Sequence, residues 1–426
     1  MAATTNALIT GLLKRNYPKQ YFKALENEEI VLLNLCDNLE DWKAQGDATY
    51  FPFFIANAKN ISGSSTGNTD IRAADQFTMV QGSVQPVEIV GNLEVSDYTR
   101  QTANAAGSFN GGDWATETEG VSTSTAKMIS RYLASSHGTG RLAMVNADTV
   151  ASTSFVAAVS EARPYGVSNL MVGDYIDIYD LDTAGASVYT NVKITNIVRS
   201  TRTVTTNTSM TLTAGQSIYR AGMYGLSING LRNTIDDGTA SATYCGQTRA
   251  TYSALNSVIT NIYNAGVATD LTEEQIRQTL NQIHSNGGRP DTAFCNPGVA
   301  DAYYRINATL RQYLVPNGSL FESKVGSPNK QSIGFRDLTL NVVRDVNALP
   351  RAFYMFKKGD IKKLIARDLG WYEDDGGMVR MGIGTVNYRT TWTAAMGWLG
   401  NIVTPAPNWM GAVLGVKDSF NGDSVA

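Results

Sequence analysis

The sequence has few residues suited to acid–base or metal chemistry. Histidine is the usual proton shuttle and a frequent metal ligand near neutral pH. This chain has two histidines, His137 and His284, far apart in the sequence. Neither the metalloprotease motif HExxH nor the phosphate-binding motif GxxxxGKS/T occurs. We therefore assign no catalytic, cofactor-binding or metal-binding residues, and we expect no cofactor and no enzymatic activity.

Two glycine-containing segments match enzyme motifs in sequence, but the elements expected around them differ from those that the motifs require. Residues 63–67 satisfy GxSxG, a nucleophile motif that needs a buried strand before it and a helix after it. Polar residues flank the string here, so we interpret it as a polar hairpin tip. Residues 138–143 satisfy GxGxxA, but they follow an expected helix, the reverse of a dinucleotide site. We interpret them as the break between a helix and a strand.

Two clusters of charged residues have a simple interpretation and a functional alternative. Residues 373–377, EDDGG, lack the alternating ligands of a calcium loop. They are interpreted as a solvated turn, with an assembly contact or an adventitious cation as the alternative. The basic run of residues 357–363 is interpreted as a solvated turn and strand, with contact to nucleic-acid phosphates as the alternative. The same alternatives apply to the basic residues at positions 14, 15, 19 and 23.

The composition limits the class of protein. The three cysteines, Cys36, Cys245 and Cys295, are widely spaced and form no CxxC pair, which argues against disulfides and zinc and favours buried small side chains. Charged residues make up 17% of the chain, against roughly 25% in an average soluble domain. A chain with so few charges must hide much neutral polar surface or share it with copies of itself. The net charge of −3 excludes a strongly basic nucleic-acid binder.

No targeting signal is recognised. The N-terminus lacks the basic-then-apolar order of a secretion signal, and no stretch approaches the ~20 apolar residues that cross a bilayer. We therefore expect a soluble protein that is made without export and does not contact a membrane.

The N-terminal part predicts an arm, a helix and a hairpin. Residues 1–17 are typical of a loose arm, and apolar residues at three- and four-residue steps predict a helix over residues 18–44. Residues 49–56 and 76–95 are rich in β-forming residues and enclose a Ser/Gly/Asn/Thr tip, which predicts a protruding β-hairpin. A two-stranded ribbon is marginal in water, so it needs this chain's own core or another subunit.

A long helix and an all-β block follow. Residues 113–136 form an apolar stripe at helical spacing, with a capping box at Thr116 and Glu119. Residues 141–219 contain only short alternating segments separated by turns, and this Thr-rich block predicts a small barrel or sandwich inserted into the host fold.

The C-terminal half mixes helices and strands. Helices are expected from about Thr251, over residues 271–285 with a capping box at Thr272 and Gln275, and over residues 296–314. Strands are expected over residues 291–295, 338–343, 352–356, 378–388 and 392–398. The predicted fold class is α+β with an inserted all-β domain.

This order of elements resembles the major capsid proteins of tailed double-stranded DNA bacteriophages, the Hong Kong ninety-seven type capsid fold. Residues 291–314 resemble a strand–helix passage of the family's axial domain, and residues 334–371 resemble a strand ending in Asp345, a proline-bearing turn and a hydrophobic strand. Residues 381–416 resemble the closing strands. The resemblance implies the following division: 1–45, N-terminal arm with helix; 46–95, extended loop; 96–140, peripheral domain with spine helix; 141–220, inserted β domain; 221–346, axial domain; 347–426, returning strands.

The resemblance also implies a function. Such proteins assemble as pentamers and hexamers into an icosahedral shell around double-stranded DNA. The implied partners are further copies, portal, scaffolding and decoration proteins, and packaged DNA held by non-specific contacts, with assembly in the bacterial cytoplasm and residence in the virion. One alternative is an encapsulin-type nanocompartment shell, which encloses protein cargo. A secreted β-rich hydrolase or adhesin is the other, against which the missing export signal and the scarcity of histidine count.

Overall fold

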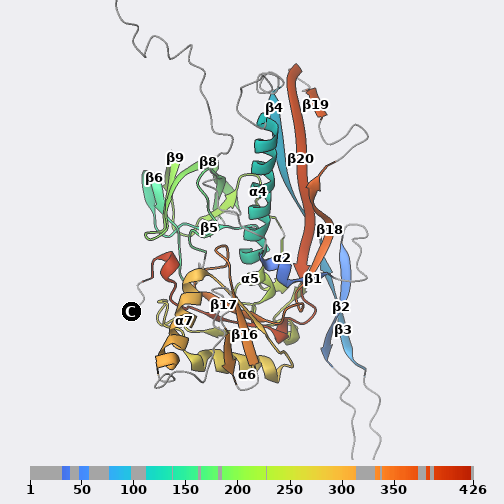
Figure 1. Ribbon diagram of the computed structural model, residues 1–426, viewed down its shortest axis with the longest axis vertical. Helices are drawn as coiled ribbons and strands as arrows, with labels where there is room; N and C mark the ends of the chain where they lie inside the picture. Colours follow the sequence, from blue (N-terminus) through green and yellow to red (C-terminus); the bar gives the residue numbers. More distant parts are fainter. Residues whose placement is uncertain are drawn as a thin grey trace, which may run out of the picture. The chain divides into compact units, whose positions relative to one another are not determined.

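The computed structural model is α+β, as predicted (Figure 1). It describes residues 31–38, 48–56, 76–96, 112–136, 138–161, 165–180, 185–226, 228–312, 332–335, 338–372, 380–383 and 388–423. These residues divide into two compact units. The first holds Glu88–Met128 and Arg367–Trp398; the second holds the described residues of Ile30–Val87, Ile129–Ala366 and Leu399–Ala426.

The first unit is a helix with long strands. The helix α4 spans Gly112–Ser135 and confirms the predicted long helix, although its last residues belong to the second unit. The capping box expected at Thr116 and Glu119 was wrong, because both residues lie inside the helix. The strands are β4 (Val87–Ser96), β18 (Lys362–Trp371), β19 (Arg380–Ile383) and β20 (Tyr388–Val403), of which β20 pairs with β4, β18 and β19.

The helix expected over residues 18–44 is present only in part. Val31–Leu35 form α2, but Asp37–Asn38 form the strand β1, which runs parallel to the start of β18. The prediction was therefore wrong at these two residues, where strand pairing overrides a helical pattern. Residues 18–30 and 39–44 of that segment lie outside the described part of the chain.

The hairpin is confirmed, with a shorter second strand than predicted. β2 (Thr49–Ala56) pairs antiparallel with β3 (Thr78–Val84). The single strand expected over residues 76–95 is divided at Gln85 and Pro86, after which β4 pairs with β20. Proline has no N–H to donate to a ladder, which explains the break. The hairpin tip, including the GxSxG string, lies outside the described residues.

The strands predicted between residues 141 and 220 are present and close into a barrel. They pair in the order β5-β10-β7-β8-β9-β6. A bridge between Val145 and Ala157 and a hydrogen bond from Asn146 N to Val156 O join β5 to β6 and complete the circle. The strands are β5 (Ala143–Met144), β6 (Thr149–Val156), β7 (Tyr175–Asp180), β8 (Ala186–Val198), β9 (Thr203–Leu212) and β10 (Ser217–Arg220), coloured green in Figure 1.

A second six-stranded sheet carries an extensive apolar core. Its order is β13-β21-β17-β14-β16-β15, and α6 (Glu273–Ser285) and α7 (Pro297–Gln312) flank it (Figure 1). Thr272 and Gln275 form the predicted capping box of α6. The strands are β13 (Val258–Asn261), β14 (Thr292–Cys295), β15 (Ser332–Phe335), β16 (Leu338–Arg344), β17 (Ala352–Phe356) and β21 (Gly411–Leu414).

The helix expected from about Thr251 was wrong. Ser253–Leu255 form a short 3-10 turn, η1, and the apolar residues that follow form β13. Val258 and Ile259 are β-branched, which favours a strand, and they pair with Gly411 and Ala412 of β21. Several short elements were not predicted: α5 (Leu231–Thr234), β11 (Thr243–Tyr244), β12 (Gln247–Thr248), η2 (Pro407–Trp409) and η3 (Ser419–Asn421).

Candidate assembly surface

One face of the β2–β3 hairpin is anchored in the core of its own chain. Phe51, Phe53 and Val84 are buried in one cluster with residues of other elements. The Phe53 ring lies 6.0 Å from that of Tyr244, and the Phe51 and Phe53 rings meet edge to face at 4.8 Å. The other members of the cluster are Cys245, Leu255, Leu364 and Val403. The root of the hairpin therefore needs no second subunit to hold its place.

Backbone contacts fix this root. Ser83 N donates a hydrogen bond to Cys245 O at 2.9 Å, and Gln247 Nε2 donates to Gln81 O at 2.7 Å. Gly82 is required because a Cβ there would lie 2.5 Å from the Phe53 ring. These contacts fix which face of the hairpin is buried.

The opposite face of the hairpin is apolar and exposed. The exposed fractions are 61% for Tyr50, 68% for Phe54, 52% for Phe77 and 48% for Met79. The Phe54 and Phe77 rings lie 5.9 Å apart. Alternate residues of a strand point to opposite faces, so burying Phe51 and Phe53 directs Tyr50 and Phe54 outward. We call these four residues the outer hairpin face; clustered exposed apolar side chains typically mark an interaction surface.

The barrel is tied to the rest of the second unit by charged contacts. Arg131, at the end of α4, is 2% exposed and donates to the Asp174 carboxylate at 2.8 Å. The same carboxylate accepts from Arg220 at 3.3 Å and from Met171 N at 3.1 Å. These contacts hold the barrel against the last residues of α4, which belong to the same unit.

The C-terminal residues form a second attachment. Arg351 donates to the Asp423 carboxylate and, at 2.8 Å, to Val159 O next to the barrel. Ser168 donates to Asn421 Oδ1 at 3.3 Å. The end of the described chain therefore connects the barrel with the second six-stranded sheet.

The cysteines are buried and free, as predicted for small core side chains. Burial raises the pKa of the Cys36 and Cys245 thiols to about 12 and also raises the pKa of Cys295. Thiolate is the reactive form of cysteine, so none of the three is suited to nucleophilic chemistry.

The remaining sequence candidates fall at separate places. Gly138 and Gly140, both at positive φ, connect α4 to β5, which confirms the helix–strand break. His284 lies on the exposed side of α6. Lys357 and Lys358 are exposed in a turn, while Lys362 opens β18 and lies 3.7 Å from Asp37, so the predicted turn and strand are confirmed. His137, the EDDGG string and the four N-terminal basic residues lie outside the described part.

Within the described ranges, no group of three or more His, Cys, Asp or Glu side chains is placed to hold a metal ion. Nor does any helix in that part of the chain have the length and apolar character needed to cross a membrane.

The outer hairpin face was not singled out from the sequence. Aromatic residues occupy both phases of the segment Tyr50-Phe51-Pro52-Phe53-Phe54. Periodicity therefore predicted a strand without showing which side is buried. Only the contact of Phe53 with Tyr244, nearly 200 positions further along the chain, decides it.

Comparison with solved structures identifies the fold. The chain is similar to one in the Cyanophage A-1(L) capsid asymmetric unit, with a TM-score of 0.60, 12% identity and coverage of 97% of this chain and 99% of that one. It is also similar to the capsid of an empty GTA particle, with a TM-score of 0.50, 6% identity and coverage of 97% and 100%. A weaker similarity, with a TM-score of 0.45 and 8% identity over 100% of this chain and 99% of that one, is to the holo-SrpI encapsulin complex from Synechococcus elongatus PCC 7942.

No protein-family model matches the sequence, and no curated protein matches it significantly. At such low identities the structural similarity establishes the fold alone. That fold is the phage capsid fold of the Hong Kong ninety-seven type, which the sequence resemblance implied.

Proposed function

We propose that this chain is the major capsid protein of a tailed double-stranded DNA bacteriophage. It assembles as pentamers and hexamers into the icosahedral head shell. The observation that carries the proposal is the match to a capsid chain over 97% of this chain at a TM-score of 0.60.

The outer hairpin face supports this function. Its four apolar side chains are exposed in the single chain, although the opposite face of the same hairpin is firmly buried. In a shell, a neighbouring copy covers this face, and the contact is repeated around each closed ring. The low content of charged residues, 17%, agrees with a surface shared among copies.

The role is structural and not enzymatic, with no catalytic, cofactor or metal residues assigned. Residues 46–95 serve as the extended loop, 96–140 as the peripheral domain, 221–346 as the axial domain and 347–426 as returning strands, with the barrel as an insertion. The partners are portal, scaffolding and decoration proteins. Lys357 and Lys358, exposed and without a salt bridge among the described residues, support non-specific contact with packaged DNA. The shell assembles in the bacterial cytoplasm and resides in the virion.

The test compares assembly of the wild type with that of a double variant, Phe54→Lys with Met79→Lys. Two desolvated lysines on the covered face oppose association, so the yield of particles in negative-stain microscopy should fall at least tenfold while the subunit stays folded. Val150→Lys is the matched control, because Val150 is an 81% exposed apolar residue on the barrel. Unchanged assembly of the double variant would refute the role of the outer hairpin face.

The nanocompartment alternative has its own outcome. Particles isolated from the natural source of the chain are expected to protect double-stranded DNA from nuclease. Particles with protein cargo and no protected DNA would instead assign the chain to the encapsulin-type shells.

A further inference from the structure

The second six-stranded sheet ends in an unpaired strand edge at β13. Val258 N donates to Met410 O at 3.0 Å and Ile262 N donates to Leu414 O at 2.8 Å, both toward β21. Successive residues of a strand direct their backbone groups to alternate sides. Ile259 and Asn261 therefore direct their N–H and C=O groups away from β21, and no backbone partner meets them among the described residues. Such an edge is a template for an added strand.

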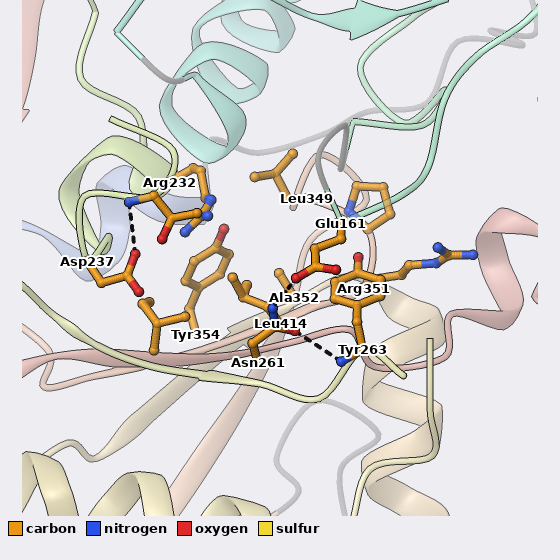
Figure 2. A pocket seen from close by; sticks show the side chains of 13 residues that line it. Glu161, Arg232, Asp237, Asn261, Tyr263, Leu349, Arg351, Ala352, Tyr354 and Leu414 are labelled. Atoms are coloured by element: carbon orange, nitrogen blue, oxygen red, sulfur yellow. Dashed lines mark hydrogen bonds between the residues drawn. The ribbon is translucent and has the colours of Figure 1, made fainter. Parts of the chain in front are cut away.

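This edge opens into a pocket, which Figure 2 shows from close by. Ile259 and Asn261 line it together with Tyr354, and the Asn261 side chain donates to Glu161 across it. The Tyr354 side chain is fully buried, yet its hydroxyl has no hydrogen-bond partner.

The size of the pocket suits one side chain of a docked segment. Its volume is about 90 Å³, below the 150 Å³ of a cavity that accepts benzene. The apolar part of its lining includes Leu349, Pro350 and Leu414. A strand paired with β13 can place one aliphatic side chain there while its backbone stays outside.

The charge around the pocket favours a basic partner. Its two arginines are already neutralised: Arg232 lies 3.0 Å from Asp236, and Arg351 pairs with Asp423. Glu161 and Asp237, which are exposed at the rim, form no salt bridge with any described residue. Among the described residues, the rim therefore carries two carboxylates that take part in no salt bridge.

One segment of this chain has the complementary composition. Residues 1–23 contain four basic residues and no acidic one, and the apolar run Ala7-Leu-Ile9 precedes Lys14 and Arg15. Segments 57–75, 97–111 and 373–379, which also lie outside the described part, each contain acidic residues. We propose that residues 1–23 of a second copy dock on the β13 edge, pairing with Ile259 and Asn261 and placing their basic residues against Glu161 and Asp237.

Disulfide trapping between two full-length variants tests the docking. One chain carries Thr239→Cys, at the pocket rim, and the other carries Leu8→Cys, Ile9→Cys or Thr10→Cys. The native cysteines are buried and do not compete. At least one pair should link, on a non-reducing gel, ten times faster than the same chain mixed with Val150→Cys. The proposal would be overturned if none of the three pairs linked faster than its Val150→Cys control. It would also be overturned if linkage occurred only when both cysteines lay in one chain.

Charge and backbone variants test the mechanism. Glu161→Gln with Asp237→Asn should slow the linkage about tenfold, whereas Glu94→Gln with Asp368→Asn, which removes two exposed carboxylates elsewhere, should leave it unchanged. Ile259→Pro removes an outward N–H together with the Ile259 side chain that lines the pocket, and it should slow the linkage in a chain that melts normally. If neither of these variants slows the linkage, the β13 site is contradicted. Shells that form without linkage overturn the docking alone, and linked dimers that never form shells overturn the capsid function alone.

Discussion

At the residue scale, the structure depends on a few buried charged groups. Asp174 accepts hydrogen bonds from Arg131, Arg220 and Met171 N, so one carboxylate joins α4, β10 and the start of β7. These ion pairs could not be predicted from the sequence, because Arg131 and Arg220 are 43 and 46 positions away from Asp174. The network exists only once the barrel has closed.

Asp174→Asn tests this attachment. The change removes the carboxylate charge that the buried Arg131 and the partly buried Arg220 contact, and it should lower the free energy of unfolding by about 3–5 kcal/mol in urea denaturation. Asp270→Asn is the matched control, because the 60% exposed Asp270 carboxylate also pairs with a basic residue, Lys417 at 2.9 Å. An exposed pair contributes about 0–1 kcal/mol. Equal effects of the two changes contradict a special role for Asp174.

Asp418 predicts a pH dependence of stability. Burial raises its pKa above the ordinary value of 3.8, while hydrogen bonds from Asn421 and Phe420 N act in the opposite direction. A carboxyl whose pKa rises on folding binds more protons in the folded state. Its stabilising contribution is therefore complete below pH 3.8 and is lost as the pH rises through the raised pKa.

Asp418→Asn removes this titration. The free energy of unfolding of the wild type relative to the variant should fall between pH 3.5 and 6, as measured by urea denaturation at each pH. The effect of other carboxyls cancels in the difference between the two proteins. If the difference in free energy of unfolding between wild type and variant stays constant or grows with pH, this role of Asp418 is contradicted.

At the element scale, the hairpin separates folding from assembly. Phe53 and Phe54 are neighbours on opposite faces, 1% and 68% exposed. Phe53→Ala should lower the free energy of unfolding by about 3–5 kcal/mol, because it leaves a cavity. Phe54→Ala should change it by less than about 0.5 kcal/mol while reducing particle yield. Thermal melting and particle counts on both variants check these two expectations. A large loss of stability with Phe54→Ala would be inconsistent with an exposed Phe54 on the outer hairpin face.

Local signals predicted the elements that local chemistry determines. The capping box at Thr272, the apolar stripe of α4 and the alternating strands of the barrel are all present. The errors occurred where distant pairing decides the structure. Val258 and Ile259 fit a helical spacing, and only parallel pairing with β21 makes them a strand. Asp37 likewise becomes a strand residue because β18 lies beside it.

At the scale of the whole molecule, the resemblance of element order predicted the fold, and the cyanophage capsid similarity over 97% of the chain confirms it. The interaction surface was only partly predictable. The hairpin was expected to need its own core or another subunit, and the structure assigns the core to Phe51 and Phe53. The outer hairpin face is left exposed for contact with a neighbouring copy; it consists of Tyr50, Phe54, Phe77 and Met79.

The most direct test is a cryo-electron microscopy reconstruction of particles formed by the purified chain. We predict closed shells of pentamers and hexamers in which Phe54 and Phe77 are buried against an adjacent copy. A chain that stays monomeric, or a shell in which the outer hairpin face remains in contact with solvent, would contradict the account.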